Sequence, residues 1–94
     1  MILMGVEIEM MLWDNHSLKA KRKVIKSMID KIHHHYKISA AEVARNDSLD
    51  YAHIGVGVVS SSKKEAEKIL NRVIRMIEEE YPVEIINISF SEGY

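Results

Sequence analysis

The chain of 94 residues contains no cysteine. Disulfide bonds, thiolate zinc sites and cysteine nucleophiles are therefore excluded, which fits a reducing compartment. Long hydrophobic runs are also lacking, because the longest apolar stretch falls far short of the ~20 residues of a membrane-spanning helix. Strand-like alternation begins at Ile2, which leaves no room for a cleavable signal. We expect a cytoplasmic protein with no membrane partner.

Glycine, proline and aromatic residues are scarce, with four glycines, one proline and 6% aromatic side chains. No repeat, linker or low-complexity segment is visible, and no Gly-rich nucleotide-binding loop links a strand to a helix. The length and the 47% hydrophobic content suit one domain, residues 1–94, with a single two-layer core. No cofactor is expected.

Charge is nearly balanced overall at −1 but is unevenly distributed. Residues 17–37 hold seven cations against Asp30, a local charge of +6. The segments on either side carry −3 (residues 1–16) and −4 (residues 38–94). A basic segment inside a near-neutral chain indicates a patch rather than a generally cationic protein.

Hydrophobic periodicity predicts four strands and two helices. The strands are expected at residues 2–12, 38–45, 52–59 and 83–91. Ser17 is the expected N-cap of a first helix that runs to about Tyr36. Ser62 and Glu65 form a capping box for the second helix, which Pro82 ends.

The last strand is expected to direct Ile86, Ile88 and Phe90 into the core, and residues 92–94 are expected to be loose. The order β-α-β-β-α-β predicts an α+β, ferredoxin-like split βαβ fold: a four-stranded antiparallel sheet with two helices on one face. The first and third strands are central. The loop 13–17, the turn 46–50 and the corner 80–82 then meet at one end, where any compact site is expected.

Four segments together resemble the YlxP-like family, small bacterial proteins of unknown function. They are Gly5-Val6, the run His16-Ser17-Leu18-Lys19-Ala20-Lys21-Arg22-Lys23, the run Ser39-Ala40-Ala41-Glu42-Val43, and Ala52-His53-Ile54-Gly55. The resemblance covers nearly the whole chain and implies a ferredoxin-like fold and a cytoplasmic location. The family's genes often lie among translation and ribosome-assembly genes, which implies a link to ribosome maturation. The family supplies no catalytic residues to carry over.

Five cations occupy the opening turns of the first helix: Lys19, Lys21, Arg22, Lys23 and Lys26. The positive end of the helix dipole makes this the least favourable place for them, at about 0.3–1 kcal/mol each. We expect these cations to lack acidic partners at i,i+4 spacing, which indicates a functional anion-binding surface. Lys64, Lys68 and Arg75 are candidates to extend it, and a merely solvated helix face is the alternative.

The sheet face away from the helices is expected to carry glycines and acids, Gly5, Glu7, Glu9, Gly55 and Gly57, without an aromatic. Base stacking of the kind used by RNA-recognition domains is therefore not expected there. Glycines on a flat central pair permit the close approach of another sheet. The self-association candidates are Leu3, Gly5, Gly55, Gly57 and Val59, and the alternative is the exposed face of a monomer.

No metal site is expected at His33, His34 and His35, because consecutive helical residues point about 100° apart. The polar loop residues Asp14, His16, Asp47 and Asp50 form no catalytic constellation by spacing. Glu42 and His53 are expected to face each other on the outer sheet face, as a structural pair rather than an acid–base couple.

The sequence therefore predicts a non-enzymatic factor that binds phosphate backbone through its first helix, with ribosomal RNA or a ribosomal subunit as the partner. One alternative is a dimeric ligand-binding or regulatory module that uses the glycine-lined face. The other is a small hydrolase or metal enzyme at the loop end. The sequence identifies no substrate and leaves the oligomeric state, a possible homodimer, open.

Overall fold

A computed structural model describes residues 1–44 and 47–93 of the chain. In chain order the elements are β1 (Ile2–Leu12), α1 (Leu18–Lys31), the π-helical continuation η1 (Ile32–Tyr36), β2 (Ser39–Glu42), β3 (Tyr51–Ser60), α2 (Lys63–Glu80) and β4 (Val83–Gly93). No helix in this described part of the chain is long and apolar enough to cross a membrane. The predicted second strand and turn included Arg45 and Asn46, which lie outside the described residues.

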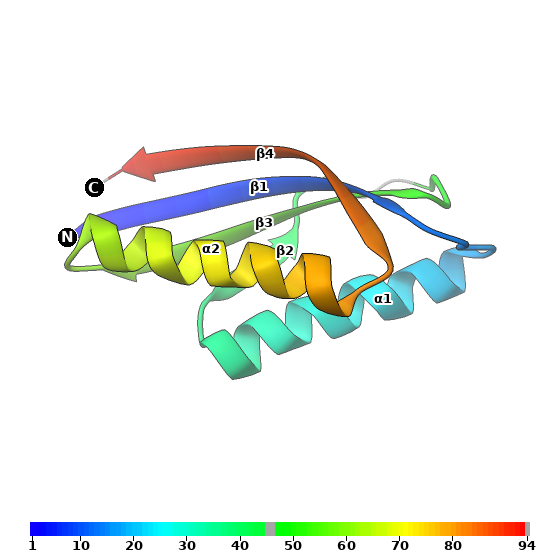
Figure 1. Cartoon of the computed structure of the whole chain (residues 1–94), viewed down its shortest axis with the longest axis horizontal. Helices are drawn as coiled ribbons and strands as arrows, with labels where there is room; N and C mark the ends of the chain where they lie inside the picture. The colour runs from blue at the N-terminus through cyan, green and yellow to red at the C-terminus, as the bar shows by residue number, and fades with distance from the viewer. Residues whose placement is uncertain (45–46, 94) are drawn as a thin grey trace.

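The four strands form one sheet in the order β2-β3-β1-β4, and every neighbouring pair is antiparallel. Both helices lie on the same face of this sheet and run in opposite directions (Figure 1). The predicted ferredoxin-like arrangement, with the first and third strands central, is therefore confirmed.

Alternating side chains of β1 and β3 form the sheet side of the core. The buried strand residues are Met4, Val6, Ile8, Met10, Leu12, Ala52, Ile54, Val56 and Val58. Each helix begins at the expected serine: Ser17 Oγ accepts a bond from the Ala20 N–H at 3.0 Å, and Ser62 Oγ accepts one from Glu65 at 3.4 Å. The caps satisfy backbone donors that a helix leaves unpaired at its start.

The prediction that Ile86, Ile88 and Phe90 belong to the core is wrong. The register of β4 against β1 shifts at Glu9/Met10, so Ile86 is an extra residue in the strand, a β-bulge. Ile88 and Phe90 lie opposite the buried Ile8 and Val6, on the helix side of the sheet, yet remain 38% and 50% exposed. β4 is an edge strand, and the helices leave this part of it uncovered.

The prediction of a loose tail is wrong for Glu92 and Gly93, which continue β4. Glu92 Oε1 forms an ion pair with Lys63 Nζ at 3.2 Å and so ties the strand to the start of α2. Tyr94 lies outside the described residues. β2 is also shorter than predicted, four residues instead of eight.

Candidate nucleic-acid interface on helix α1

Four of the five predicted cations project into solvent from the first two and a half turns of α1: Lys19, Arg22, Lys23 and Lys26. No acidic residue occupies the first turn. Among the described residues Lys19, Arg22 and Lys23 take part in no ion pair. We call these four residues the cation face of α1.

Lys21 is a correction to the predicted anion-binding set. Its side chain is only 4% exposed, and its Nζ donates a hydrogen bond to the carbonyl oxygen of Ser48 at 2.6 Å. Position 21 lies on the same side of the helix as Leu18 and Ile25, three and four residues away. The ammonium group therefore holds the segment before β3 and is not presented to a ligand.

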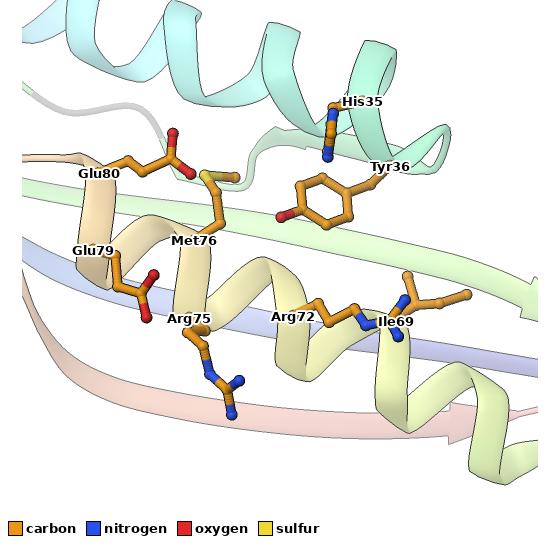
Figure 2. A pocket seen from close by; sticks show the side chains of 8 residues that line it. All are labelled: His35, Tyr36, Ile69, Arg72, Arg75, Met76, Glu79 and Glu80. Atoms are coloured by element: carbon orange, nitrogen blue, oxygen red, sulfur yellow. The ribbon is translucent and has the colours of Figure 1, made fainter.

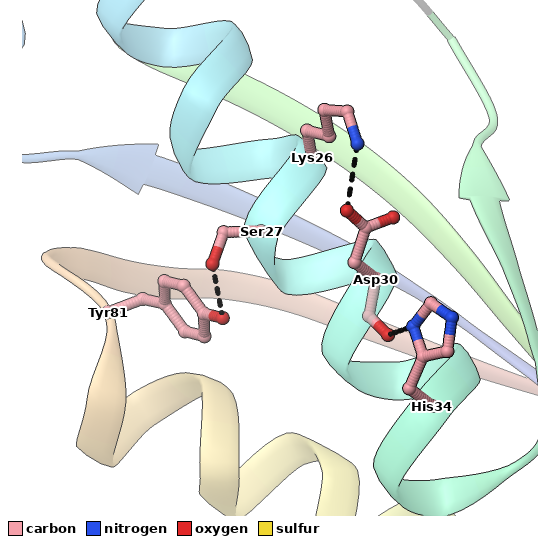
Figure 3. A network of polar contacts seen from close by, with 5 residues as sticks. All are labelled: Lys26, Ser27, Asp30, His34 and Tyr81. Atoms are coloured by element: carbon pink, nitrogen blue, oxygen red, sulfur yellow. Dashed lines mark hydrogen bonds and ion pairs between the residues drawn. The ribbon is translucent and has the colours of Figure 1, made fainter.

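Lys26 also differs from the expectation, because it has an acidic partner. Its Nζ lies 2.9 Å from Asp30 Oδ2, an i,i+4 ion pair on the helix surface (Figure 3). The hydrogen bond from Lys26 holds the pKa of the Asp30 carboxyl below its ordinary value. Exposed pairs of this kind contribute little and exchange easily, so Lys26 stays accessible to a competing phosphate.

A shallow groove of about 290 Å³ runs beside the cation face, between α1 and β2. Arg22 and Lys26 form one rim, Ile25 and Ile29 the floor, and Glu42 the other rim. This position of Glu42 corrects its predicted pairing with His53, because Glu42 lies opposite Ile54 in the ladder. His53 Nε2 instead lies 2.9 Å from Glu7 Oε1.

The segments after β1, before β3 and after α2 do meet at one end of the fold, as the topology predicted. The Asn15 side chain donates to the carbonyl oxygens of Ser17 (3.0 Å) and Leu49 (2.6 Å), and the Trp13 N–H donates to Pro82 at 2.9 Å. Asp14 there adopts a positive φ of 50°. Within residues 1–44 and 47–93, no three His, Asp or Glu side chains are close enough together to hold a metal ion.

The three consecutive histidines have three separate environments. His33 Nε2 bonds to the backbone carbonyl of Ala40 in β2 (3.0 Å), and His34 Nδ1 bonds to the carbonyl of Asp30 (2.8 Å, Figure 3). The His35 ring packs edge-on against Tyr36. Of the three rings, that of His33 connects the helix to another element, β2, and the rings diverge as expected for consecutive helical residues.

The α2 cations do not extend the cation face. α1 and α2 run in opposite directions, so the start of α2, with Lys64 and Lys68, lies at the far end from the start of α1 (Figure 1). Arg75 lines a separate groove of about 430 Å³ between η1 and α2 and extends away from η1 (Figure 2). Glu79 and Glu80 line the same groove, so its charge is balanced.

The outer sheet face divides into a polar half and an apolar half. In the polar half the Glu9 carboxylate accepts hydrogen bonds from the Tyr51 hydroxyl and from Asn87 Nδ2 (2.7 Å), and these bonds lower the pKa of Glu9. Tyr51 is an aromatic that the prediction missed, because the third strand begins one residue earlier than expected. Its hydroxyl is engaged with Glu9, and it lies beside negative charge, which is unfavourable for nucleic acid.

The apolar half contains four of the five predicted self-association residues. Leu3 pairs across the strands with Val59, and Gly5 with Gly57, and a hollow of about 330 Å³ lies over the two glycines. Gly55 does not belong to this hollow, because Val43 covers it: a Cβ at position 55 would lie 2.6 Å from Val43 Cγ2. Self-association through this face stays a prediction.

Comparison with known proteins agrees with the resemblance drawn from the sequence motifs. The family model for DUF503, described as a protein of unknown function, matches residues 3–90. The uncharacterized protein YlxP of Bacillus subtilis (strain 168) is 33% identical over 72 residues, which are 77% of this chain and 78% of that relative. The chain therefore belongs to the DUF503 family.

Proposed function

We propose that this protein acts by binding rather than by catalysis, and that the cation face of α1 binds the phosphate backbone of structured RNA. Ribosomal RNA, free or in a ribosomal subunit, is the expected partner. The main support is that Lys19, Arg22 and Lys23 are exposed and form no ion pair among the described residues. They lie at the start of a helix that has no acidic residue in its first turn.

The electrostatic cost of this arrangement supports the proposal. Cations near a helix N-terminus oppose the macrodipole, and neighbouring like charges repel each other. A bound polyanion relieves both effects at once, because each phosphate neutralises a cation and releases condensed counterions. Lysine and arginine side chains placed in this way recognise the backbone and not the bases.

The surroundings of the cation face favour a backbone contact on the helix side of the molecule. Ser17 caps the helix, and the Lys21–Ser48 hydrogen bond connects the helix to the segment before β3. The four cations therefore project from a helix start that is held in place by two contacts. The outer sheet face, with Glu7 and Glu9, is directed away from α1. RNA approaching α1 therefore does not meet these carboxylates.

The experiment is binding of a structured ribosomal RNA fragment, measured by fluorescence anisotropy, with co-sedimentation on ribosomal subunits as the second readout. The variant Arg22→Glu/Lys23→Glu should lose most of the affinity. The matched control is Lys64→Glu/Lys68→Glu, the same charge change on exposed positions of α2. Equal losses in both variants would show non-specific electrostatics and would remove the assignment to α1.

A further inference from the structure

The second feature of the molecule without an assigned role is the free edge of β4. β4 is eleven residues long and pairs with β1 on one side only, whereas the opposite edge strand, β2, has four residues. An edge strand presents a row of backbone N–H and C=O groups with no partner in the sheet. A short edge such as β2 exposes few of them, and β4 exposes many.

β4 has few of the devices that keep edge strands of monomers from pairing. From Ile85 to Ser91 it contains no charged residue and no proline, and the bulge at Ile86 is its one irregularity. Ile86, Ile88 and Phe90 are 48%, 38% and 50% exposed along this uncharged segment. Uncharged, β-branched and aromatic residues at an open edge favour the addition of another strand.

We propose that the partner of this edge is a second copy of the chain, whose β4 adds antiparallel across a two-fold axis to give one eight-stranded sheet. The charges of the strand restrict the register. An axis through Ile88 would set Glu84 opposite the partner's Glu92, with like charges facing each other. An axis through Ser89 avoids this contact and sets Ile88 opposite the partner's Phe90, a favourable cross-strand pair that occurs twice.

The surface beside the free edge of β4 can accommodate a second copy of the chain. A groove of about 390 Å³ lies between β4 and the start of α2, with Met4 and Phe90 among its lining residues. Ile88 and Phe90 are on the helix side of the sheet, so the partner's side chains at these positions enter that groove. Lys63 holds Glu92 at the end of the groove, which neutralises the one carboxylate inside the paired segment.

The dimer leaves the cation face open. α1 borders β2, at the opposite edge of the sheet, since Arg22 and Lys26 share a groove with Glu42. Pairing through β4 therefore places the two copies of α1 at the outer ends of the assembly. The inference does not rest on the proposed function. Dimerisation can be measured in a variant that no longer binds RNA, and RNA binding can be measured in a variant that no longer dimerises.

Sedimentation velocity over a concentration series tests the dimer. The wild type should have twice the chain mass of 10.8 kDa, and Phe90→Glu should have the mass of one chain. Val59→Glu changes the other candidate self-association surface, since Val59 is 61% exposed on the outer sheet face, and this variant should stay dimeric if β4 is the interface. A wild-type monomer at every concentration would overturn the proposal, as would dissociation by Val59→Glu with Phe90→Glu still dimeric.

Single cysteines test the register, because the chain has none of its own. A mixture of the Ile88→Cys and Phe90→Cys variants should form a disulfide-linked heterodimer under mild oxidation, and Ser89→Cys should link to itself. Ser39→Cys, exposed on the opposite edge, is the control and should stay unlinked. Linking of Ile88→Cys to itself, without the mixed product, would contradict the axis through Ser89.

Discussion

The Nζ of Lys21 donates a hydrogen bond to the carbonyl oxygen of Ser48 at 2.6 Å, from a side chain that is 4% exposed. The contact joins α1 to the segment that leads into β3. It also divides the five cations of the helix into two groups, because Lys21 holds the fold and the four residues of the cation face are presented to solvent. The two groups predict different consequences for substitutions that remove the same charge.

Replacing Lys21 by Met should lower the free energy of unfolding by about 1–2 kcal/mol, because a charged donor is lost from the Ser48 carbonyl. The matched variant Lys23→Met, two residues away and exposed, should change it by less than about 0.5 kcal/mol. Urea denaturation measures both. Similar destabilisation of the two variants would show that the Lys21 contact has no stabilising effect.

Replacing Ala20 by Glu should stabilise the protein and weaken RNA binding at the same time. Ala20 is exposed and stands three residues after the Ser17 N-cap, so a glutamate there gives the Ser-x-x-Glu sequence of a capping box, which Ser62 and Glu65 also have. The glutamate charge also attracts the neighbouring cations and interacts favourably with the positive end of the helix dipole. The free energy of unfolding should rise by about 0.5 kcal/mol.

The variant Ala20→Gln separates the two effects, because glutamine also suits a capping box but adds no charge. Thermal denaturation should give a larger gain for Ala20→Glu than for Ala20→Gln, because glutamate alone adds the favourable charge, and anisotropy should give a several-fold loss of RNA affinity for glutamate alone. If Ala20→Glu left the affinity unchanged, the cation face would not be the contact.

The sequence predicted the fold well because its signals are local and repeated. Alternation in β1 and β3 and serine caps before both helices each indicate an element without reference to the rest of the chain. Even the burial of Lys21 had a signal: Leu18, Lys21, Ile25 and Met28 follow the three-four spacing of a buried stripe. The charge of Lys21 indicates the surface, whereas its position in the helix indicates the core.

The errors in prediction concern relationships between elements. Alternation placed Ile88 and Phe90 on the correct face of β4, but whether a helix covers them depends on where α2 ends and begins. The partner of His53 depends on strand register, which set Glu7 beside it and turned Glu42 toward α1. No pattern in a single strand contains that information.

Gly55 and Gly57 should respond differently to alanine. A Cβ at Gly55 meets Val43 Cγ2 at 2.6 Å, whereas at Gly57 nothing lies closer than 4.0 Å. Gly55→Ala should cost about 1 kcal/mol, at the low end for overpacking because Val43 is half-exposed, and Gly57→Ala should be neutral or slightly stabilising.

The double variant Gly55→Ala/Val43→Ala should recover part of the loss, since it removes the methyl group that the new Cβ meets. Chemical denaturation of Gly55→Ala, Val43→Ala and the double variant gives the free energies of unfolding to be compared. Strictly additive effects of the two substitutions would contradict the contact between Val43 and position 55.

Stability should fall in acid partly through Glu9. Hydrogen bonds from Tyr51 and Asn87 lower the pKa of Glu9 below its ordinary value. The resulting stabilisation is complete above the pKa of the unfolded chain and is lost as the pH falls through the folded pKa. Tyr51→Phe removes the larger cause, so its urea midpoint should decline less than that of the wild type between about pH 6 and pH 3. Parallel declines would argue against this contribution.

The salt dependence of RNA binding tests the central claim most directly. Three to four phosphate contacts predict a slope of log K against log salt concentration of about −2 to −3.5. Arg22→Glu/Lys23→Glu should flatten that slope by about 2, while Lys64→Glu/Lys68→Glu should leave it unchanged. A wild-type slope near zero, or one that the α1 variant does not alter, would contradict phosphate binding by the cation face.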